Sequence, residues 1–219
     1  MTAARDGSPV DLYLRLPPRG EAELVHDAIP GGAEILELGC GVGRVTHELL
    51  RLGHPVVAVD EAPEMLQHVR GATTVCARIE ELELGRRFPC VLLMSNLVNT
   101  DPAERAAFLA TCARHVAAGG VVLVERHEPG WHPAEGTGGQ VGELAVSLEN
   151  VKQDAGTVSA TVRYDAADAT WRHSFTAYVL TDGELDAALA EAGLRLESVL
   201  DDAGRWVEAA PIIRDIVAA

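Results

Sequence analysis

The chain has 219 residues, of which 47% are hydrophobic, and it carries a formal net charge of −15 at pH 7. This length supports one sizeable core, and the apolar content excludes a wholly disordered chain. The acidic balance argues against a nucleic-acid partner and against binding to an anionic membrane surface, because both depend on lysine and arginine.

The four cysteines, Cys40, Cys76, Cys90 and Cys112, show no C-x-x-C spacing and lie in or beside apolar segments. We interpret them as reduced thiols and expect no zinc or other metal site. No apolar stretch is long enough to cross a bilayer, and residues 1–15 lack the apolar core of a signal peptide. The expected location is therefore cytoplasmic.

Apolar runs alternate with helix-like segments through the first half of the chain. Buried strands are expected at residues 35–38, 56–59, 73–76, 90–94 and 121–124. Helices are expected at 45–52, from Pro63, and from Asp101 to about Ala117, where Gly119 and Gly120 should end the helix. This alternation predicts an α/β fold in which helices cover both faces of a mainly parallel sheet.

The pattern changes after Glu128. Residues 129–140 are rich in glycine and proline and indicate a loop, and strand-like segments follow at 144–151, 157–164 and 171–180. These segments predict an antiparallel β meander inserted into the core. A capping box at Thr181–Glu184 opens a helix to Ala192, and residues 194–200 form a last strand. Residues 201–219 are ambiguous, with a short helix as one option over 211–217.

We therefore expect one domain over residues 1–219. Its core would comprise about 20–128 and 174–219, and the inserted meander about 129–173.

The segment Glu37-Leu38-Gly39-Cys40-Gly41-Val42-Gly43 joins the first strand to the next helix. Glycines permit a tight turn and a close approach of the backbone to a ligand. A dinucleotide site requires G-x-G-x-x-G, but Arg44 stands where the third glycine should be. Asp60, at the end of the second strand, is suited to accept hydrogen bonds from both ribose hydroxyls, with Glu61 as the alternative.

The run E-L-G-C-G-V-G resembles motif I of class I S-adenosylmethionine-dependent methyltransferases. With the element order, it most resembles small-molecule enzymes of the sugar N,N-dimethyltransferase type. The resemblance implies a Rossmann-like three-layer sandwich with a mainly parallel seven-stranded sheet, whose last strand is antiparallel, and S-adenosylmethionine as the cofactor. It implies cofactor contacts from Tyr13, Glu37, Gly39, Cys40, Gly41, Gly43, Asp60, Glu61, Met65, Arg78, Ile79, Glu80 and Asn96.

Several of these positions have a specific role in the resemblance. Tyr13 lies in a segment that covers the cofactor in such enzymes, and Met65 would pack near the ribose and adenine, although core packing is an equal alternative. Arg78 stands where an aspartate is usual, which leaves Ile79 as the adenine contact. Glu80 would lie beside it or form part of a solvated turn.

The residues expected to face the acceptor follow the fourth and fifth strands. Ser95–Asn99 lacks the N-P-P-Y pattern of enzymes that methylate DNA amines or glutamine, which argues against both acceptors. A base is needed for a hydroxyl or ammonium acceptor, and His127 is our candidate. The candidates for substrate binding are Asn99, His127, Trp131, His132 and His173. For each histidine the alternative is a surface or packing role.

The sequence thus predicts an enzyme, monomeric or homodimeric, that transfers a methyl group from S-adenosylmethionine to N or O of a small molecule. The alternatives are a non-catalytic methyltransferase-like binding protein and an NAD(P)-dependent oxidoreductase.

Overall fold

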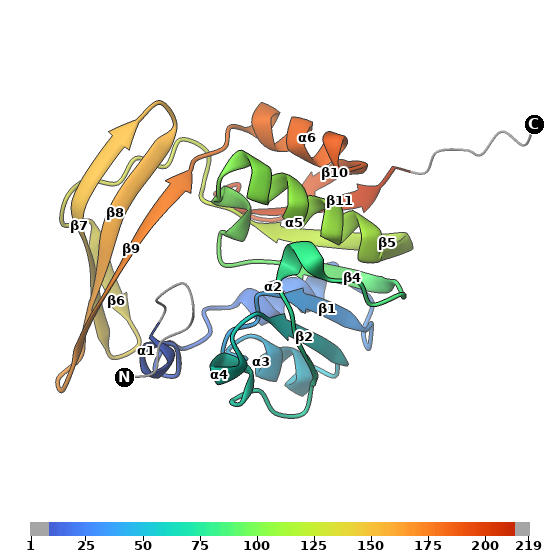
Figure 1. Ribbon diagram of the computed structural model, residues 1–219, viewed down its shortest axis with the longest axis horizontal. Coiled ribbons are helices and arrows are strands. Elements are labelled where there is room, and N and C mark those ends of the chain that lie inside the picture. The colour runs from blue at the N-terminus through green and yellow to red at the C-terminus, as the bar shows by residue number, and fades with distance from the viewer. Residues whose placement is uncertain (1–8, 213–219) are drawn as a thin grey trace, which may run out of the picture.

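The computed structural model describes residues 9–212, which form a layered core beside a separate antiparallel sheet (Figure 1). The central sheet contains seven strands: β1 (Ile35–Leu38), β2 (Val56–Asp60), β3 (Thr73–Cys76), β4 (Phe88–Leu93), β5 (Val116–Glu125), β10 (Leu194–Val199) and β11 (Trp206–Pro211). Their order is β10-β11-β5-β4-β1-β2-β3, and β11 runs antiparallel to both of its neighbours. The expected mainly parallel sheet with an antiparallel last strand is confirmed.

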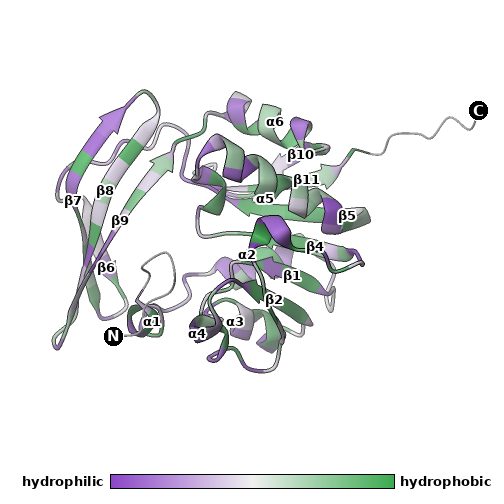
Figure 2. Ribbon diagram, viewed as in Figure 1, coloured by the Kyte–Doolittle hydropathy of each residue, from purple (hydrophilic) through white to green (hydrophobic). Residues whose placement is uncertain are grey.

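Helices cover both faces of this sheet. One face packs against α5 (Pro102–His115), α6 (Asp182–Glu191) and the short helix η1 (Ile79–Glu81). The other packs against α2 (Glu21–Ala28) and α3 (Thr46–Arg51). Two short helices complete the core, α4 (Pro63–Leu66) and η2 (Leu97–Asn99). The central strands are almost continuously hydrophobic (Figure 2), as expected for strands buried on both faces.

Two helix starts follow from their caps. The Asp101 carboxylate accepts hydrogen bonds from the backbone N–H groups of Ala103 and Glu104, at 3.0 and 3.2 Å. Thr181 and Glu184 form the reciprocal capping box that opens α6. Both features were expected from the sequence and are confirmed, because a side-chain acceptor at this position satisfies otherwise unpaired backbone donors.

The expected end of α5 was wrong. The helix stops at His115, and the chain enters β5 at Val116 without an intervening loop. Gly119 and Gly120 therefore lie inside β5. A Cβ at Gly120 would stand 2.7 Å from the carbonyl oxygen of Pro89, so glycine allows the backbones of β4 and β5 to approach closely.

The inserted meander is a four-stranded sheet in the order β6 (Gly138–Val141), β7 (Leu144–Asp154), β8 (Thr157–Asp165) and β9 (Thr170–Tyr178). β6 lies in the segment expected to be a loop. A Cβ at Gly138 would stand 1.9 Å from the carbonyl oxygen of Val146, so only glycine fits this pairing. β9 pairs with β8 as far as Tyr178, so this sheet continues beyond the expected boundary at residue 173.

Side chains alternate across β8 and β9, although Thr176 also contributes to the lining of the cleft. Hydroxyl pairs lie on the outer face, with Ser159 and Thr176 at 2.8 Å and Thr161 and Ser174 at 3.0 Å. The residues between them, including Val162, His173, Phe175 and Ala177, point to the inner face and line a cleft against the core.

Helix α1 (Val10–Tyr13) lies between the two sheets (Figure 1). Val10 packs with Val42, Ala62 and Met65 of the core, whereas Leu12 packs with Leu144 and Trp171 of the four-stranded sheet. The indole Nε1 of Trp171 donates to Asp11 Oδ2 at 3.1 Å. Polar and apolar contacts thus attach α1 to both units.

The last strand, β11, was not located from the sequence. Most of the alternative helix at 211–217 lies outside the described residues, and Pro211 belongs to β11. Within residues 9–212, none of the helices has the length and apolarity needed to cross a membrane.

Candidate functional site

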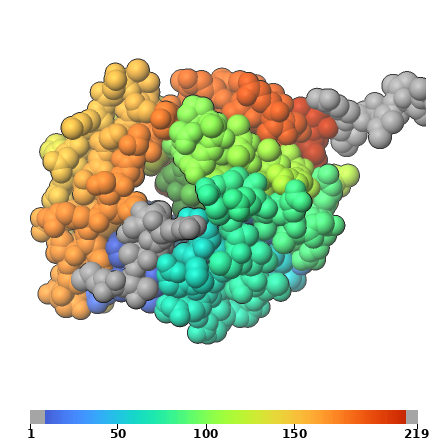
Figure 3. Space-filling model, viewed as in Figure 1, coloured from blue at the N-terminus to red at the C-terminus, as the bar shows by residue number. Residues whose placement is uncertain are grey.

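A cleft of about 770 Å³ lies between the carboxyl ends of the central strands and the inner face of the four-stranded sheet (Figure 3). A smaller cavity of about 230 Å³ adjoins it beneath the glycine loop. The cleft brings together most of the expected site residues: Tyr13, Gly39, Gly41, Asp60, Glu61, Met65, Arg78, Ile79, Glu80, Asn96, Asn99, His127, Trp131 and His173. Cys40 lines the smaller cavity. This is where ligands of open α/β sheets bind.

The glycine loop turns sharply at the end of β1. The N–H groups of Gly39 and Cys40 both donate to the carbonyl of Val59 at 2.9 Å, which ties the loop to β2. Gly39 and Gly41 have φ angles of +73° and +56°. A Cβ at Gly39 would stand 2.6 Å from Leu97 Cδ1, whereas one at Gly41 would meet nothing within 4 Å. Glycine is therefore required for conformation at both positions and for space at Gly39.

The carboxylate of Asp60 is held rigidly at the end of β2. Its Oδ2 accepts from the N–H of Gly41 at 2.8 Å, and its Oδ1 accepts from the N–H of Ala62 at 2.9 Å. Asp60 thus links the glycine loop to the floor of the cleft with its orientation fixed.

Glu37 does not line the cleft. Its side chain is fully buried, and its Oε2 accepts a hydrogen bond from Thr46 Oγ1 at 2.5 Å. Burial raises the pKa of Glu37 to about 7, and its Oε1 has no hydrogen-bond partner among the described residues. Thr46, in the first turn of α3, draws the carboxyl group beneath the loop, so the Glu37 side chain lies behind the cleft wall.

Gly43 also lies outside both cavities. A Cβ there would stand 3.0 Å from His47 Cε1 and 3.2 Å from Val69, so this glycine serves the packing of α3. Cys40, in contrast, lines the smaller cavity while remaining buried. Burial raises the pKa of the Cys40 thiol well above its usual range, so the thiol stays protonated.

The segment after β3 forms one wall of the cleft. Ile79 is buried, and its carbonyl accepts a hydrogen bond from Thr111 Oγ1 at 2.9 Å, which fixes η1 against α5. Arg78 is half-exposed at the rim and pairs with Glu80 and, at 3.9 Å, with Glu61. The arginine is therefore neutralised by carboxylates on either side of it.

The turn after β4 has a left-handed backbone and a buried polar atom without a partner among the described residues. Ser95 and Asn96 both have φ angles of +58°. Asn96 Oδ1 is buried without a hydrogen-bond partner among the described residues, although Asn96 lines the cleft. Asn99 differs, because its Nδ2 donates to the Tyr178 carbonyl at 2.7 Å and its Oδ1 accepts from the His127 N–H at 2.8 Å. Asn99 therefore joins η2, β5 and β9.

Aromatic side chains line the opposite end of the cleft. His127 stacks on Trp131 with 3.9 Å between ring centroids and 3° between planes, and Trp131 lies 6.2 Å from Phe175. Burial, with a smaller effect of Arg205, lowers the pKa of His127 to about 4. The imidazole is thus neutral at pH 7, because its charged form is desolvated and repelled by a neighbouring cation.

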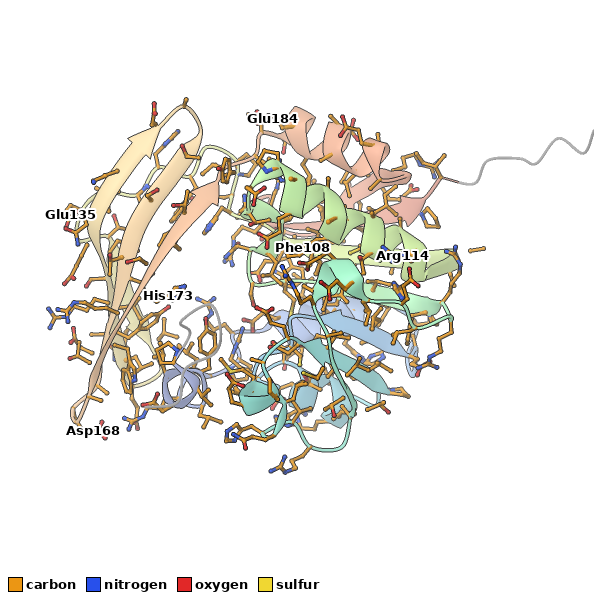
Figure 4. All side chains as sticks on the ribbon, in the orientation of Figure 1. Phe108, Arg114, Glu135, Asp168, His173 and Glu184 are labelled. Atoms are coloured by element: carbon orange, nitrogen blue, oxygen red, sulfur yellow. The ribbon has the colours of Figure 1, made fainter. Side chains whose placement is uncertain are left out.

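The other two candidate histidines have different surroundings. His173 lies on the inner face of β9, across the cleft from Phe108 of α5 (Figure 4). His132 is exposed, and its Nδ1 lies 2.9 Å from Gln153 Oε1 on β7. His132 is therefore not among the residues that line the cleft, and its contact with a substrate stays a prediction.

The sequence of this chain is similar to those of known methyltransferases. Residues 35–120 match the family model described as a methyltransferase domain. An uncharacterised methyltransferase of Mycobacterium tuberculosis is 33% identical over 132 residues, which cover 57% of this chain and 54% of the relative. A ubiquinone biosynthesis O-methyltransferase of Bradyrhizobium sp. is 32% identical over 108 residues, which cover 46% and 42%. The chain thus spans about half the length of the curated relatives that it matches.

Solved structures share the fold along nearly the whole chain. The CcbJ methyltransferase from Streptomyces caelestis has a TM-score of 0.73 at 23% identity, over 90% of this chain and 91% of that one. The sugar N-methyltransferase KedS8 from Streptoalloteichus sp. has a TM-score of 0.69 at 20% identity, over 96% and 94%.

Residues 35–120 thus match a methyltransferase domain, and the chain shares the fold of the solved methyltransferases.

The glycine loop lies within the matched residues, in agreement with its resemblance to motif I of S-adenosylmethionine-dependent methyltransferases. One similar structure, the amino pentose methyltransferase CalS10 from Micromonospora echinaspora, was solved with S-adenosylmethionine bound. The residues of the cleft fit this molecule in two respects. Open space lies over Gly41 beside the Asp60 carboxylate, and the buried Oδ1 of Asn96 lacks a donor among residues 9–212, which a ligand would bring.

The structure also shows cleft residues that sequence reasoning missed. They are Arg19, Ala62, Ala77, Ser95, Leu97, Thr100, Glu104, Phe108, Val146, Leu148, Val162, Phe175, Thr176 and Ala177. The alternating pattern of β9 contains a signal for Phe175, because it shares the strand face of His173. For Arg19, which precedes α2, the sequence contains no such signal.

Proposed function

We propose that this protein transfers a methyl group from S-adenosylmethionine to a small molecule, and that the acceptor atom is an amine nitrogen. One observation carries the proposal. The glycine loop, Asp60 and the Ser95–Asn96 turn end three adjacent strands at one cleft, and an aromatic wall around Trp131 closes that cleft. A donor site and an acceptor site therefore share one enclosed space.

Residues at the donor end have distinct parts in this proposal. Asp60 accepts hydrogen bonds from the ribose hydroxyls, and Ile79 and Met65 flank the adenine. Arg19, which lines both cavities, binds the carboxylate of the amino-acid portion. The bound sulfonium supplies an activated methyl group, so the chain's remaining task is to align the acceptor, which is worth about 7–11 kcal/mol when alignment is good.

The protonation state of His127 favours an amine over an aliphatic hydroxyl. In methyl transfer the acceptor's lone pair forms the new bond to carbon, and the electrons of the breaking S–CH₃ bond stay on sulfur. A hydroxyl needs a base to take its proton, but an imidazole with a pKa of about 4 is a weak base at pH 7. An amine that loses its ammonium proton to solvent before it binds attacks as the neutral form without a base, and the methylated product releases any remaining proton afterwards. In this proposal the neutral His127 orients the acceptor together with Trp131.

O-methylation is the second candidate, because curated relatives that match about half of this chain are named ubiquinone biosynthesis O-methyltransferases. An acidic phenol would need little help from a base. The full-length likeness to the sugar N-methyltransferase KedS8 supports the amine instead, since it includes the four-stranded sheet that walls the acceptor end.

Two measurements test the proposal. Calorimetric titration should detect S-adenosylhomocysteine binding in the wild type, a large loss in Asp60→Asn, and no loss in the matched control Asp27→Asn, whose side chain is exposed. Mass spectrometry should then detect methylated products from a panel of ring-bearing amines but not from their alcohol analogues. Binding of NAD in place of S-adenosylhomocysteine would overturn the cofactor assignment, and methylation of the alcohols alone would overturn the amine.

A further inference from the structure

The turn after β4 is held in a conformation that its residues do not prefer. Ser95 and Asn96 are consecutive, neither is glycine, and both have φ angles of +58°. Left-handed backbone brings the Cβ of an L-residue close to its carbonyl oxygen; asparagine tolerates it better than serine, so Ser95 bears most of the strain and needs a contact that enforces it. Both residues line the main cleft and the smaller cavity. The strain therefore lies at the centre of the site.

Glu125, the last residue of β5, provides the enforcing contact. Its Oε2 accepts a hydrogen bond from the Ser95 N–H at 2.8 Å, and its Oε1 accepts from Arg205 Nη2 at 2.5 Å. The Glu125 side chain is only 4% exposed. Both of its oxygens thus bind donors from other parts of the chain, in charge-assisted bonds that are stronger than neutral ones.

Arg205 is itself fixed in the connection between β10 and β11. Its N–H donates to Asp201 Oδ1 at 2.8 Å, and its carbonyl accepts from the Arg126 N–H at 2.8 Å. The contacts form a continuous path from the β10–β11 connection through Glu125 to Ser95. This path meets the site from the side opposite the glycine loop.

We propose that Glu125 is a positioning residue that, supported by Arg205, holds Ser95 and Asn96 in the left-handed conformation and so shapes the cavity for the cofactor. The inference rests on the proposed function. When the Ser95 N–H loses its acceptor, the turn relaxes, and Asn96 Oδ1 moves away from its place beside the glycine loop. The competent turn is then only a fraction of the population, and the apparent affinity for the cofactor falls in proportion.

An experiment can distinguish this positioning role of Glu125 from direct contact with a ligand. Glu125 lines the smaller cavity, so its carboxylate is also placed to contact a ligand directly. The two cases differ in their response to glycine. Glycine adopts φ near +60° without strain, so Ser95→Gly removes the need for a holding contact but does not replace a lost ligand contact.

The experiment measures S-adenosylhomocysteine affinity by calorimetry in the full chain. Glu125→Ala should weaken binding about tenfold, because the left-handed strain at one residue is large enough to reduce the competent turn by roughly that factor. Glu125→Ala/Ser95→Gly should recover most of the affinity. The matched control Glu125→Ala/Asn150→Gly should recover none, because Asn150 has a φ of +56° in β7, away from both cavities.

Glu125→Gln guards against a variant that fails to fold. Its amide oxygen still accepts from the Ser95 N–H while the charge is lost, so its affinity should lie between those of the wild type and Glu125→Ala. Amide exchange at Ser95 should be slow in the wild type and fast in Glu125→Ala.

Two results would overturn the inference. One is unchanged affinity in Glu125→Ala, and the other is a loss that Ser95→Gly does not recover, which would make Glu125 a direct ligand contact. A wild-type chain that does not bind S-adenosylhomocysteine would refute the proposed function instead, and exchange at Ser95 would still decide whether Glu125 holds the turn.

Discussion

Replacing Glu37 by glutamine should make this protein more stable above neutral pH. Glu37 is fully buried between β1 and α3, with one hydrogen bond from Thr46 and an Oε1 that has no partner among the described residues. Burial disfavours the charged carboxylate and raises its pKa from the ordinary value of 4.5 to about 7. Glutamine keeps an oxygen acceptor for Thr46 and does not ionise.

The magnitude follows from the two pKa values. A pKa difference of one unit corresponds to about 1.36 kcal/mol, so a shift from 4.5 to about 7 corresponds to ~3 kcal/mol. Because the folded chain holds this proton more tightly than the unfolded chain, the stability of the wild type falls as the pH rises from about 4.5 to about 7. The Glu37→Gln variant lacks this loss, so it should exceed the wild type by up to ~3 kcal/mol above pH 7.

Urea denaturation at about pH 5 and about pH 8.5 measures this difference. The variant's advantage should be large at the higher pH and small at the lower one. The control Glu83→Gln alters a carboxylate that is 80% exposed. Its free energy of unfolding should differ from that of the wild type by the same amount at both pH values. A stability advantage of the same size at both pH values would refute the reasoning. A difference that arises from the ionisation of Glu37 must grow as the pH rises.

Three further predictions concern Gly39, Trp171 and His127. Gly39→Ala should weaken both S-adenosylhomocysteine binding and stability, because its Cβ would stand 2.6 Å from Leu97. The control Gly32→Ala has a similar φ but open space around the Cβ, so it should lower stability slightly and leave binding unchanged in calorimetry. Trp171→Ala should cost about 3–5 kcal/mol in denaturation and expose the α1 segment to proteolysis, since Trp171 anchors α1; resistance equal to the wild type would contradict this. His127 favours its neutral form in the folded chain, so its contribution to stability is present above pH 6.5 and is lost as the pH falls towards about 4. His127→Gln should therefore reduce the loss of stability at acid pH. An equal loss in the variant and the wild type would refute the lowered pKa of His127.

Local rules predicted the elements whose causes lie close together in the sequence. The caps at Asp101 and Thr181 bind backbone donors within three residues, so their helices were expected and are present. The end of α5 depends instead on how β5 pairs with β4, since Gly120 lies against Pro89, about thirty residues away along the chain. A glycine pair indicates a stop by local propensity alone, and the tertiary contact overrides it.

The candidate site divides in the same way. Gly39, Gly41 and Asp60 lie at the carboxyl ends of adjacent parallel strands, a relation that the order of elements already implies. Whether a side chain enters the cleft is a different question, because it depends on neighbours distant in sequence. Thr46 draws Glu37 beneath the loop, and Gln153 holds His132 outside the cleft.

Strand periodicity and the conformational freedom of glycine are properties of short segments, so the order of residues predicts the class of fold and the place of the glycine loop. The remaining features depend on how the folded chain packs. Packing places β11 between β5 and β10, turns the inner face of the four-stranded sheet towards the core, and sets Glu125 against Ser95. These contacts join residues far apart along the chain, and packing and hydrogen bonding select them only once the sheets are assembled.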